Sequence, residues 1–184
     1  MKWAATIVSL GLIASNVIAA PLESEAKDDL NLFNLKISAP NNPELDGRYL
    51  SQEGSDVGLY EGDPSPIRVY KTSSQKKGRN QLHTYPIGIV DHALGLVGPP
   101  DFMTLTDMIN PARVKPKDGE VAVWDTFVIS HDRLTNDGRG AWLAFPAAES
   151  SWRIKWSDGS AFTTEDYMPV EVLMEKEGEG RYNM

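Results

Sequence analysis

Asp125 is the side chain of this sequence whose setting most suggests acid–base chemistry. It lies in the apolar run EVAVWDTFVI, residues 120–129, and interrupts a face formed by Val121, Val123, Phe127 and Ile129. A carboxylate on an apolar face must be paired, raised in pKa or exposed by a bulge. Glycosidic cleavage requires two carboxyl groups roughly 5 to 10 Å apart, and the candidates for a second acid are Asp158, Glu165 and Asp166. The simpler interpretation is that a bulge or strand end directs Asp125 to solvent or to an arginine. We therefore expect no catalytic residue, with Asp125 as the single candidate.

Other catalytic and metal-binding motifs do not occur in the sequence. There is no cysteine and no Gly-x-Ser-x-Gly nucleophile turn. Ser130, His131 and Asp132 are neighbours, and neighbours on a strand point to opposite faces. The histidines His83, His92 and His131 show neither H-x-H nor HExxH spacing, although His83 and His92 could approach each other across a hairpin. Because no phosphate-binding glycine loop occurs either, we expect no metal and no cofactor.

Aromatic side chains could instead form a platform on which a sugar stacks. The stretch SWRIKWSDGS, residues 151–160, places Trp152, Ile154 and Trp156 on one side of a strand and basic residues on the other. Ile154 gains nothing from contact with water, so it marks the face that it shares with the two tryptophans as interior. The Asp-Gly pair that follows provides a turn at the end of the strand. We expect these tryptophans in the core, and the sequence indicates no ligand-binding residue.

The N-terminal sequence has the pattern of a secretory signal peptide. MKWAATIVSLGLIASNVIAAP combines one lysine, an apolar run and small residues, which predicts a leader over residues 1–19. The apolar run is shorter than the roughly 20 residues that cross a bilayer. The net charge of −8 disfavours nucleic acids and anionic membranes as partners. We expect a secreted monomer without disulfides, whose partner is cell-wall polysaccharide or a host protein.

Short stretches of alternating apolar and polar residues predict an all-β fold. Examples are LFNLKI, IRVY and HALGLV, which are separated by turn sequences rich in Pro, Gly, Asn and Asp. They predict a single domain of about ten to twelve short strands with at most one or two short helices. The domain is expected to be a barrel or a sandwich, and the pattern is also compatible with a trefoil. The run EVAVWDTFVI is apolar on both faces and suits a central strand covered on both sides. DFMTLTDMINP, residues 101–111, also fits helical spacing, with Asp101 as N-cap and Pro111 as stop.

The predicted β domain spans residues 32–176. Residues 20–31, APLESEAKDDLN, are acidic and poor in aromatic residues, which predicts an arm or a short propeptide. The C-terminal sequence has a similar composition, so residues 177–184 are expected to form a flexible tail.

Two stretches resemble a group of small secreted fungal proteins. FNLKISAPNNPELDGRYL is similar to their opening, in which a Phe-x-Leu strand leads through a Ser/Ala-Pro turn to a glycine and a second short strand. AWLAF and SSWRIKWSDGSAFTTEDYMPVEVLME are similar to their end, where a tryptophan strand precedes a Tyr-x-Pro-Val strand. The families that they resemble are the phialide cell-wall proteins and the related secreted elicitors of the plant hypersensitive response. The resemblance implies an extracellular or wall-associated β domain without established catalysis, and it carries over no functional residue.

These observations lead to two hypotheses on function. We expect a non-enzymatic secreted protein that is associated with the cell wall or acts as an effector. The alternative is a carbohydrate-active protein, either a glycan-binding module or a glycoside hydrolase that uses Asp125 with a second carboxylate. A groove shared by an open tryptophan face and a pair of carboxylates would favour the alternative.

Overall fold

The computed structural model describes residues 30–62, 64–148 and 150–180, so the expected signal peptide and most of the acidic arm lie outside the described residues. The expected all-β fold is confirmed, because these residues form thirteen antiparallel strands and one 3-10 turn, η1 (Pro111–Arg113). The strands are β1 (Leu30–Ser38), β2 (Ser51–Glu53), β3 (Asp56–Leu59), β4 (Arg68–Ser73), β5 (Asn80–Tyr85), β6 (His92–Gly98), β7 (Phe102–Ile109), β8 (Val121–Val123), β9 (Phe127–Ser130), β10 (Arg133–Asn136), β11 (Ala141–Ala148), β12 (Ser151–Ser157) and β13 (Met168–Gly180). None of the described segments contains a helix long and apolar enough to span a membrane.

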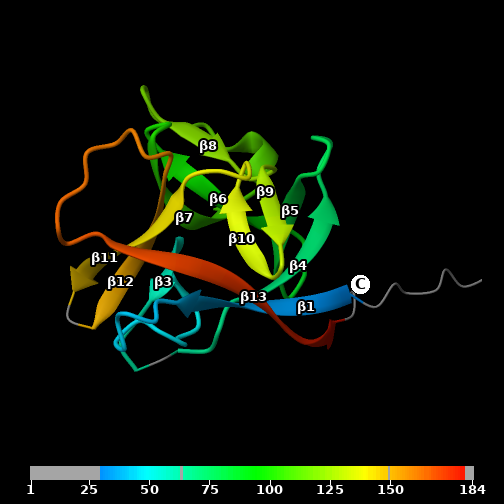
Figure 1. The fold of residues 1–184 in the computed structure, drawn as a ribbon. Coiled ribbons are helices and arrows are strands. Elements are labelled where there is room, and N and C mark those ends of the chain that lie inside the picture. Colours follow the sequence, from blue (N-terminus) through cyan, green and yellow to red (C-terminus); the bar gives the residue numbers. More distant parts are fainter. Residues whose placement is uncertain (1–29, 63, 149, 181–184) are drawn as a thin grey trace, which may run out of the picture.

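Strand pairing closes the sheet on itself. β1 pairs with β4, β4 with β5, β5 with β9, β9 with β10, β10 with β13, and β13 pairs again with β1. The other strands extend from β13 through β11, β12, β3 and β7 to β6, and β6 returns to β5. In Figure 1, β1 and β13 cross one side of the molecule while β6 and β8 lie on the opposite side. Closure of this kind leaves few of the unpaired edges that an open sheet would expose.

The first and last strands extend the domain beyond the expected limits of residues 32 and 176. β1 begins at Leu30 and β13 continues to Gly180, because the two strands pair from Leu30↔Gly180 to Ser38↔Glu171. Residues 177–180, expected in a flexible tail, therefore form the end of a strand. Their acidic composition disfavours a core position, but a strand held by a partner's backbone hydrogen bonds needs no apolar side chains there.

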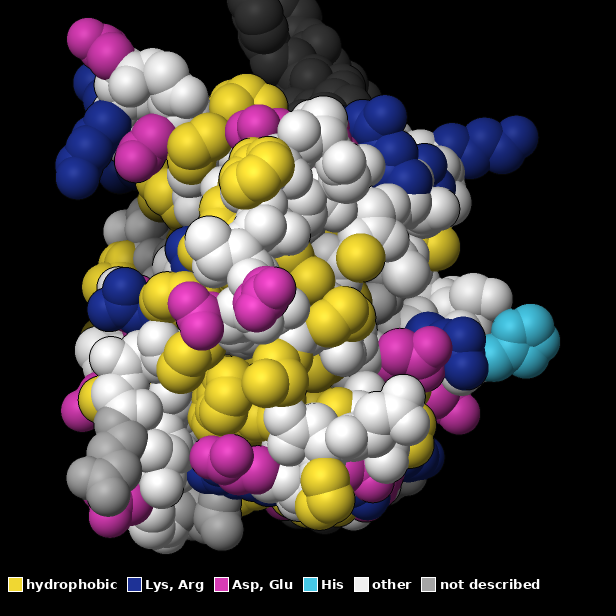
Figure 2. All heavy atoms as spheres, turned by 60° about the vertical axis from the view of Figure 1, so that its left-hand side comes forward, with side chains coloured by type: hydrophobic (Ala, Val, Ile, Leu, Met, Phe, Trp, Pro, Cys, Tyr) yellow, Lys and Arg dark blue, Asp and Glu magenta, His cyan; other side chains and the backbone are white. Residues whose placement is uncertain are grey.

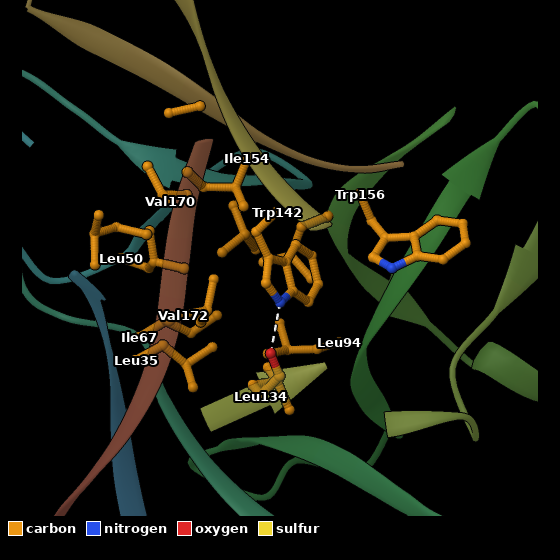
Figure 3. Close-up of a cluster of buried hydrophobic side chains, with 14 of the residues drawn as sticks. Leu35, Leu50, Ile67, Leu94, Leu134, Trp142, Ile154, Trp156, Val170 and Val172 are labelled. Carbon is orange, nitrogen blue, oxygen red and sulfur yellow. Dashed lines mark hydrogen bonds between the residues drawn. The ribbon is translucent and has the colours of Figure 1, made fainter. Parts of the chain in front are cut away.

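Three tryptophans lie in the core, as the sequence predicted for two of them. Trp142, Trp152 and Trp156 are only 3% to 7% exposed, and Ile154 is completely buried. The indole of Trp142 points toward β10, where its Nε1 donates a hydrogen bond of 2.6 Å to the carbonyl oxygen of Leu134 (Figure 3). The prediction from SWRIKWSDGS is therefore confirmed. These rings fill the interior and offer no face on which a sugar could stack.

The stretch DFMTLTDMINP forms strand β7 and not a helix. Its residues Met103, Leu105 and Asp107 are buried at a spacing of two, and the strand pairs with β6 from Val97↔Thr104 to His92↔Ile109. The helical spacing of its apolar residues was therefore coincidental. Only the three residues that follow Asn110 make a helical turn, η1.

The run EVAVWDTFVI does not form the central strand that its composition suggested. It is broken at residues 124–126 into β8, which lies at the end of the sheet, and β9, which pairs with β10. Thr126 lies in the break and donates from Oγ1 to Asn136 Oδ1 at 2.6 Å. The break therefore allows polar side chains at these positions to form hydrogen bonds, which the apolar surroundings of a continuous buried strand would not provide.

Candidate functional site

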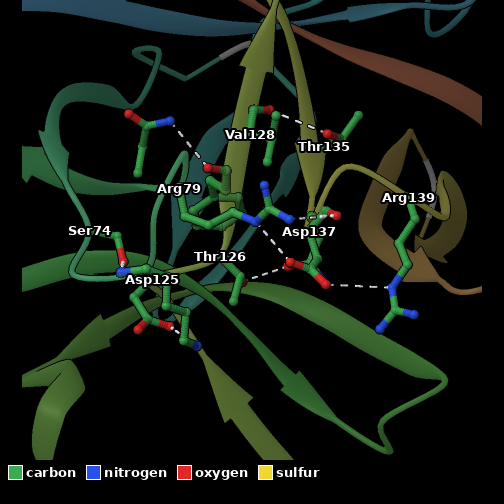
Figure 4. A network of polar contacts seen from close by, with 12 residues as sticks. Ser74, Arg79, Asp125, Thr126, Val128, Thr135, Asp137 and Arg139 are labelled. Atoms are coloured by element: carbon green, nitrogen blue, oxygen red, sulfur yellow. Dashed lines mark hydrogen bonds and ion pairs between the residues drawn. The ribbon is translucent and has the colours of Figure 1, made fainter.

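Asp125 lies in the break between β8 and β9, where a lysine holds its carboxylate. Asp125 Oδ1 accepts a hydrogen bond of 2.9 Å from Lys76 Nζ, and the contact of Arg79 Nε with Asp137 Oδ1, at 2.8 Å, belongs to the same polar region (Figure 4). The end of a strand directs this side chain outward, as the simpler interpretation predicted, although the cation is a lysine and not an arginine.

The proposed second acids do not join Asp125. Asp158 Oδ1 accepts hydrogen bonds from Ser160 N and Ser160 Oγ at 2.8 and 2.6 Å, and these bonds hold the pKa of Asp158 below its usual value. Glu165 and Asp166 are exposed in the segment between β12 and β13. Within the described segments no acid pair forms around Asp125, so its position offers no support for glycosidic cleavage.

The histidines are placed separately. Ser130 Oγ lies 3.1 Å from His131 Nδ1, because His131 has a φ of 50° and belongs to a turn, not to the strand that would have directed the two side chains apart. Both residues are exposed, and the structure gives Asp132 no contact with them. His83 pairs with Ala93 of β6, the residue that follows His92 in the sequence. The two histidines nevertheless contact different carboxylates, His83 that of Asp91 and His92 that of Asp107. In the parts of the chain that the structure describes, no three metal-ligating side chains gather.

His92 and Asp107 line a pocket of about 590 Å³, which we call the dyad pocket. His92 Nδ1 lies 2.7 Å from Asp107 Oδ2. The Asp107 side chain is 2% exposed, whereas the His92 side chain is 37% exposed. A buried carboxylate bonded to one ring nitrogen fixes both the orientation and the tautomer of an imidazole. His92 is therefore presented to the pocket as an oriented polar group.

The carboxylate of Asp107 is engaged on both oxygens. Besides the contact with His92, Oδ2 accepts a hydrogen bond from Gln52 Nε2 at 3.0 Å, and Oδ1 accepts one from Thr84 Oγ1 at 3.2 Å. The backbone N–H of Asp107 donates to Ser55 O at 2.8 Å. Strands β2, β5, β6 and β7 thus converge on one buried carboxylate. Such complete satisfaction is what permits a charged group in the interior.

The mouth of the dyad pocket is mainly apolar. It is lined by Tyr85, Pro86, Ile89 and Val90, and the buried Ile67 also belongs to the pocket lining. Ile89 is fully exposed and Val90 is 40% exposed. The guanidinium of Arg68 lies 4.9 Å from the centre of the Tyr85 ring and so covers one of its faces. An apolar wall with a few convergent polar groups is typical of a site for a small ligand.

The dyad pocket does not hold the pair of carboxyl groups that glycosidic cleavage requires. Asp107 is the single carboxylate among the residues that line it, and its oxygens are already bonded. A glycosidase needs a second carboxyl group, as general acid, nucleophile or base. The Nε2 of His92 has no hydrogen-bond partner among the described residues, so it is one of the polar groups that remain open to a ligand.

Sequence reasoning missed Asp107, although a signal for it was present. Asp107 continues the buried face of Met103 and Leu105 at a spacing of two, the same interruption of an apolar face that drew attention to Asp125. The helical spacing of the same stretch obscured that signal. The pairing of Asp107 with His92 also depends on the register between β6 and β7, which single-sequence patterns do not give.

A second hollow, of about 900 Å³, lies between the turn after β1 and the start of β13. Its apolar residues include Pro40, Trp142 and Met168, and Figure 2 shows apolar side chains gathered over the face on which β11 and β12 lie. Its only lining carboxylate, Glu171, is paired with Arg133 at 3.1 Å. Trp142 is buried, and Glu171 has no second carboxylate beside it in the lining. This hollow therefore lacks the open tryptophan face and the carboxylate pair that would favour a hydrolase.

A small aromatic cluster covers the outer face of β7, β11 and β12. The ring of Tyr167 lies 4.5 Å from that of Phe145 and 5.2 Å from that of Phe102, between ring centres. Lys155 Nζ lies 4.9 Å from the centre of the Phe102 ring, and burial lowers the pKa of this lysine. These contacts hold the segment between β12 and β13 against the sheet. The positions of the three rings are therefore explained by their contacts with one another, and no ligand needs to be invoked.

Comparisons with protein-family models, with curated proteins and with solved structures find no significant match to this chain. Its function must therefore be argued from the geometry of its own residues.

Proposed function

We propose that this chain is a secreted, non-enzymatic protein that binds an extracellular ligand in the dyad pocket, with cell-wall polysaccharide as the partner. The single observation that carries the proposal is the pairing of the buried Asp107 with the partly exposed His92 at the floor of a pocket with an apolar mouth. A fixed polar group beside apolar walls provides orientation and affinity together. The signal-peptide pattern of residues 1–19 supports an extracellular site of action.

The absence of an acid pair among the pocket residues favours binding over catalysis. The only carboxylate of the dyad pocket, Asp107, accepts hydrogen bonds from Gln52 and Thr84 and contacts His92, so it cannot act as a free general acid or nucleophile. Asp125, in turn, is paired with Lys76 away from the pocket lining. A glycan-binding role would retain the carbohydrate part of the alternative hypothesis without its hydrolytic part.

The test is retention on insoluble cell-wall polysaccharide after the pocket is filled. Val90→Trp adds an indole at a partly exposed position of the pocket mouth, so it should block the pocket without disturbing the core. Ala148→Trp is the matched control, because it adds the same group at an exposed end of β11 that does not line the pocket. We expect the first variant to be retained at least tenfold less than the wild type, and the control to be retained equally.

Two results would contradict the proposal. Equal retention of both variants would show that the dyad pocket is not the contact. Release of new reducing ends from the polysaccharide by the wild type, lost in the first variant, would show that the pocket catalyses hydrolysis.

A further inference from the structure

We infer that the dyad pocket selects an uncharged ring that carries hydroxyl groups, such as a sugar, and rejects carboxylates and phosphates. This inference rests on the proposed function and names the ligand class of the same site. It follows from which atoms around His92 hold hydrogens.

The tautomer of His92 follows from its partner. A carboxylate is only an acceptor, so the contact of 2.7 Å between His92 Nδ1 and Asp107 Oδ2 requires the proton on Nδ1. In the neutral ring Nε2 then carries a lone pair. The structure gives this nitrogen no partner among the described residues. The floor of the pocket thus presents an acceptor, which a ligand must meet with an O–H or N–H group.

The same hydrogen bonds make Asp107 a rigid support for this tautomer. Gln52 Nε2 donates to Asp107 Oδ2 at 3.0 Å and to Gly54 O at 2.8 Å, which uses both of its hydrogens. The Gln52 side-chain oxygen is a second acceptor among the residues that line the pocket. Two acceptors in one pocket suit a ligand with more than one hydroxyl group.

The charges around the pocket disfavour an anionic ligand. With the His92 ring in its neutral form, Arg68 provides one positive charge and Asp107 one negative charge, so the lining as a whole is close to neutral. An anion that approached His92 would meet the Nε2 lone pair and, behind it, the Asp107 carboxylate, and the whole chain carries −8. The five N–H groups of Arg68 can also donate to hydroxyl oxygens.

The apolar wall completes the match with a sugar ring. Ile89 and Val90 are exposed at the mouth, and Pro86 lies beside them in the lining. A pyranose ring has one face of C–H groups and a rim of hydroxyls, so it can cover the apolar wall while its rim reaches His92. Covering exposed apolar side chains favours binding.

The test measures binding of small soluble probes to the full mature chain by calorimetry. The neutral probes are methyl β-glucoside and myo-inositol, and the anionic probe of similar size is cyclohexanecarboxylate. We expect at least one neutral probe to bind tenfold more tightly than the carboxylate. We also expect His92→Phe to weaken that binding at least tenfold, while the control His131→Phe, at an exposed histidine outside the pocket, leaves it unchanged. A hexasaccharide that binds more tightly than the glucoside would identify a polymer as the source of the ring, and equal affinity would identify a free sugar or chain end.

Nitrogen NMR of the imidazole tests the tautomer independently of any ligand. We expect the neutral ring of His92 to carry its proton on Nδ1, and Asp107→Asn, whose amide can donate to Nδ1, to shift the proton toward Nε2. A proton on Nε2 in the wild type, tighter binding of the carboxylate, or no binding of either neutral probe would overturn the inference. If Val90→Trp still abolished retention on wall polysaccharide, the proposed function would stand while the selection of an uncharged ring failed.

Discussion

Replacement of Trp142 and of Trp152 by phenylalanine should have clearly different costs, although both indoles are buried. Trp142 Nε1 donates a hydrogen bond of 2.6 Å to Leu134 O within the core. Trp152 Nε1 is buried and has no hydrogen-bond partner among the described residues. The two substitutions remove the same atoms, so the difference between them isolates the value of the N–H group.

The magnitude follows from the energetics of buried polar groups. Trp142→Phe removes a hydrogen bond and leaves the Leu134 carbonyl with one donor fewer, which costs about 1 to 3 kcal/mol beyond the lost ring atoms. Trp152→Phe removes an N–H group that is buried without a partner, and the relief offsets part of the lost packing. We therefore expect Trp142→Phe to lower the free energy of unfolding by about 1 to 3 kcal/mol more than Trp152→Phe does.

The measurement is urea unfolding of both variants followed by far-ultraviolet circular dichroism, which reports mainly the loss of backbone structure. Truncation of Trp152 or Trp156 to alanine provides the reference, with an expected loss of about 3 to 5 kcal/mol from a total of roughly 5 to 15 kcal/mol. Equal losses in the two phenylalanine variants, or a greater loss for Trp152→Phe, would refute the reasoning from the two N–H groups.

Three further predictions concern charged and titrating groups. Asp125→Asn should leave retention on wall polysaccharide within twofold of the wild type, because the Asp125 carboxylate is paired with Lys76. A large loss of retention in a variant that keeps its fold would instead indicate a functional role for Asp125. Burial raises the pKa of Tyr60 from 10.0 to about 12, so the neutral phenol stabilises the fold below pH 10 and this contribution is lost as the pH rises through about 12. Thermal midpoints measured across this range should fall more steeply for the wild type than for Tyr60→Phe. Parallel curves for the two proteins would contradict the assignment. Burial lowers the pKa of Lys155 below 10.5, so the charge of this lysine disfavours folding at neutral pH and ceases to do so above the pKa of the unfolded chain. Lys155→Met should therefore have a thermal midpoint at pH 7 that matches or exceeds that of the wild type. A clearly lower midpoint of the variant at pH 7 would count against this prediction.

The carbohydrate alternative now depends on the dyad pocket and not on tryptophans. Trp142, Trp152 and Trp156 are buried, and outside the core the rings of Phe145 and Tyr167 stack on each other. A ligand would meet the apolar mouth and His92 instead. This separates the binding part of the hypothesis, which the pocket supports, from the hydrolytic part built on Asp125.

Some features of the structure follow from local patterns in the sequence. Alternation at a spacing of two placed Trp152, Ile154 and Trp156 inside, because neighbours on a strand point to opposite faces wherever the strand lies in the sheet. The all-β fold followed for the same reason, since turn residues and alternating stretches act over a few residues. The interrupted apolar face also favoured a bulge or strand end at Asp125, and Asp125 lies in the break before β9.

Only the tertiary structure decided which groups meet. The closing of β13 onto β1, the division of EVAVWDTFVI into two strands and the meeting of His92 with Asp107 all depend on pairing between distant segments. The contacts of Asp107 come from residues as far apart as Gln52 and Thr84, whose positions relative to one another are set by strand register. A shift of one residue in that register would turn Asp107 to the other face of its strand, so no local pattern could have predicted the pocket.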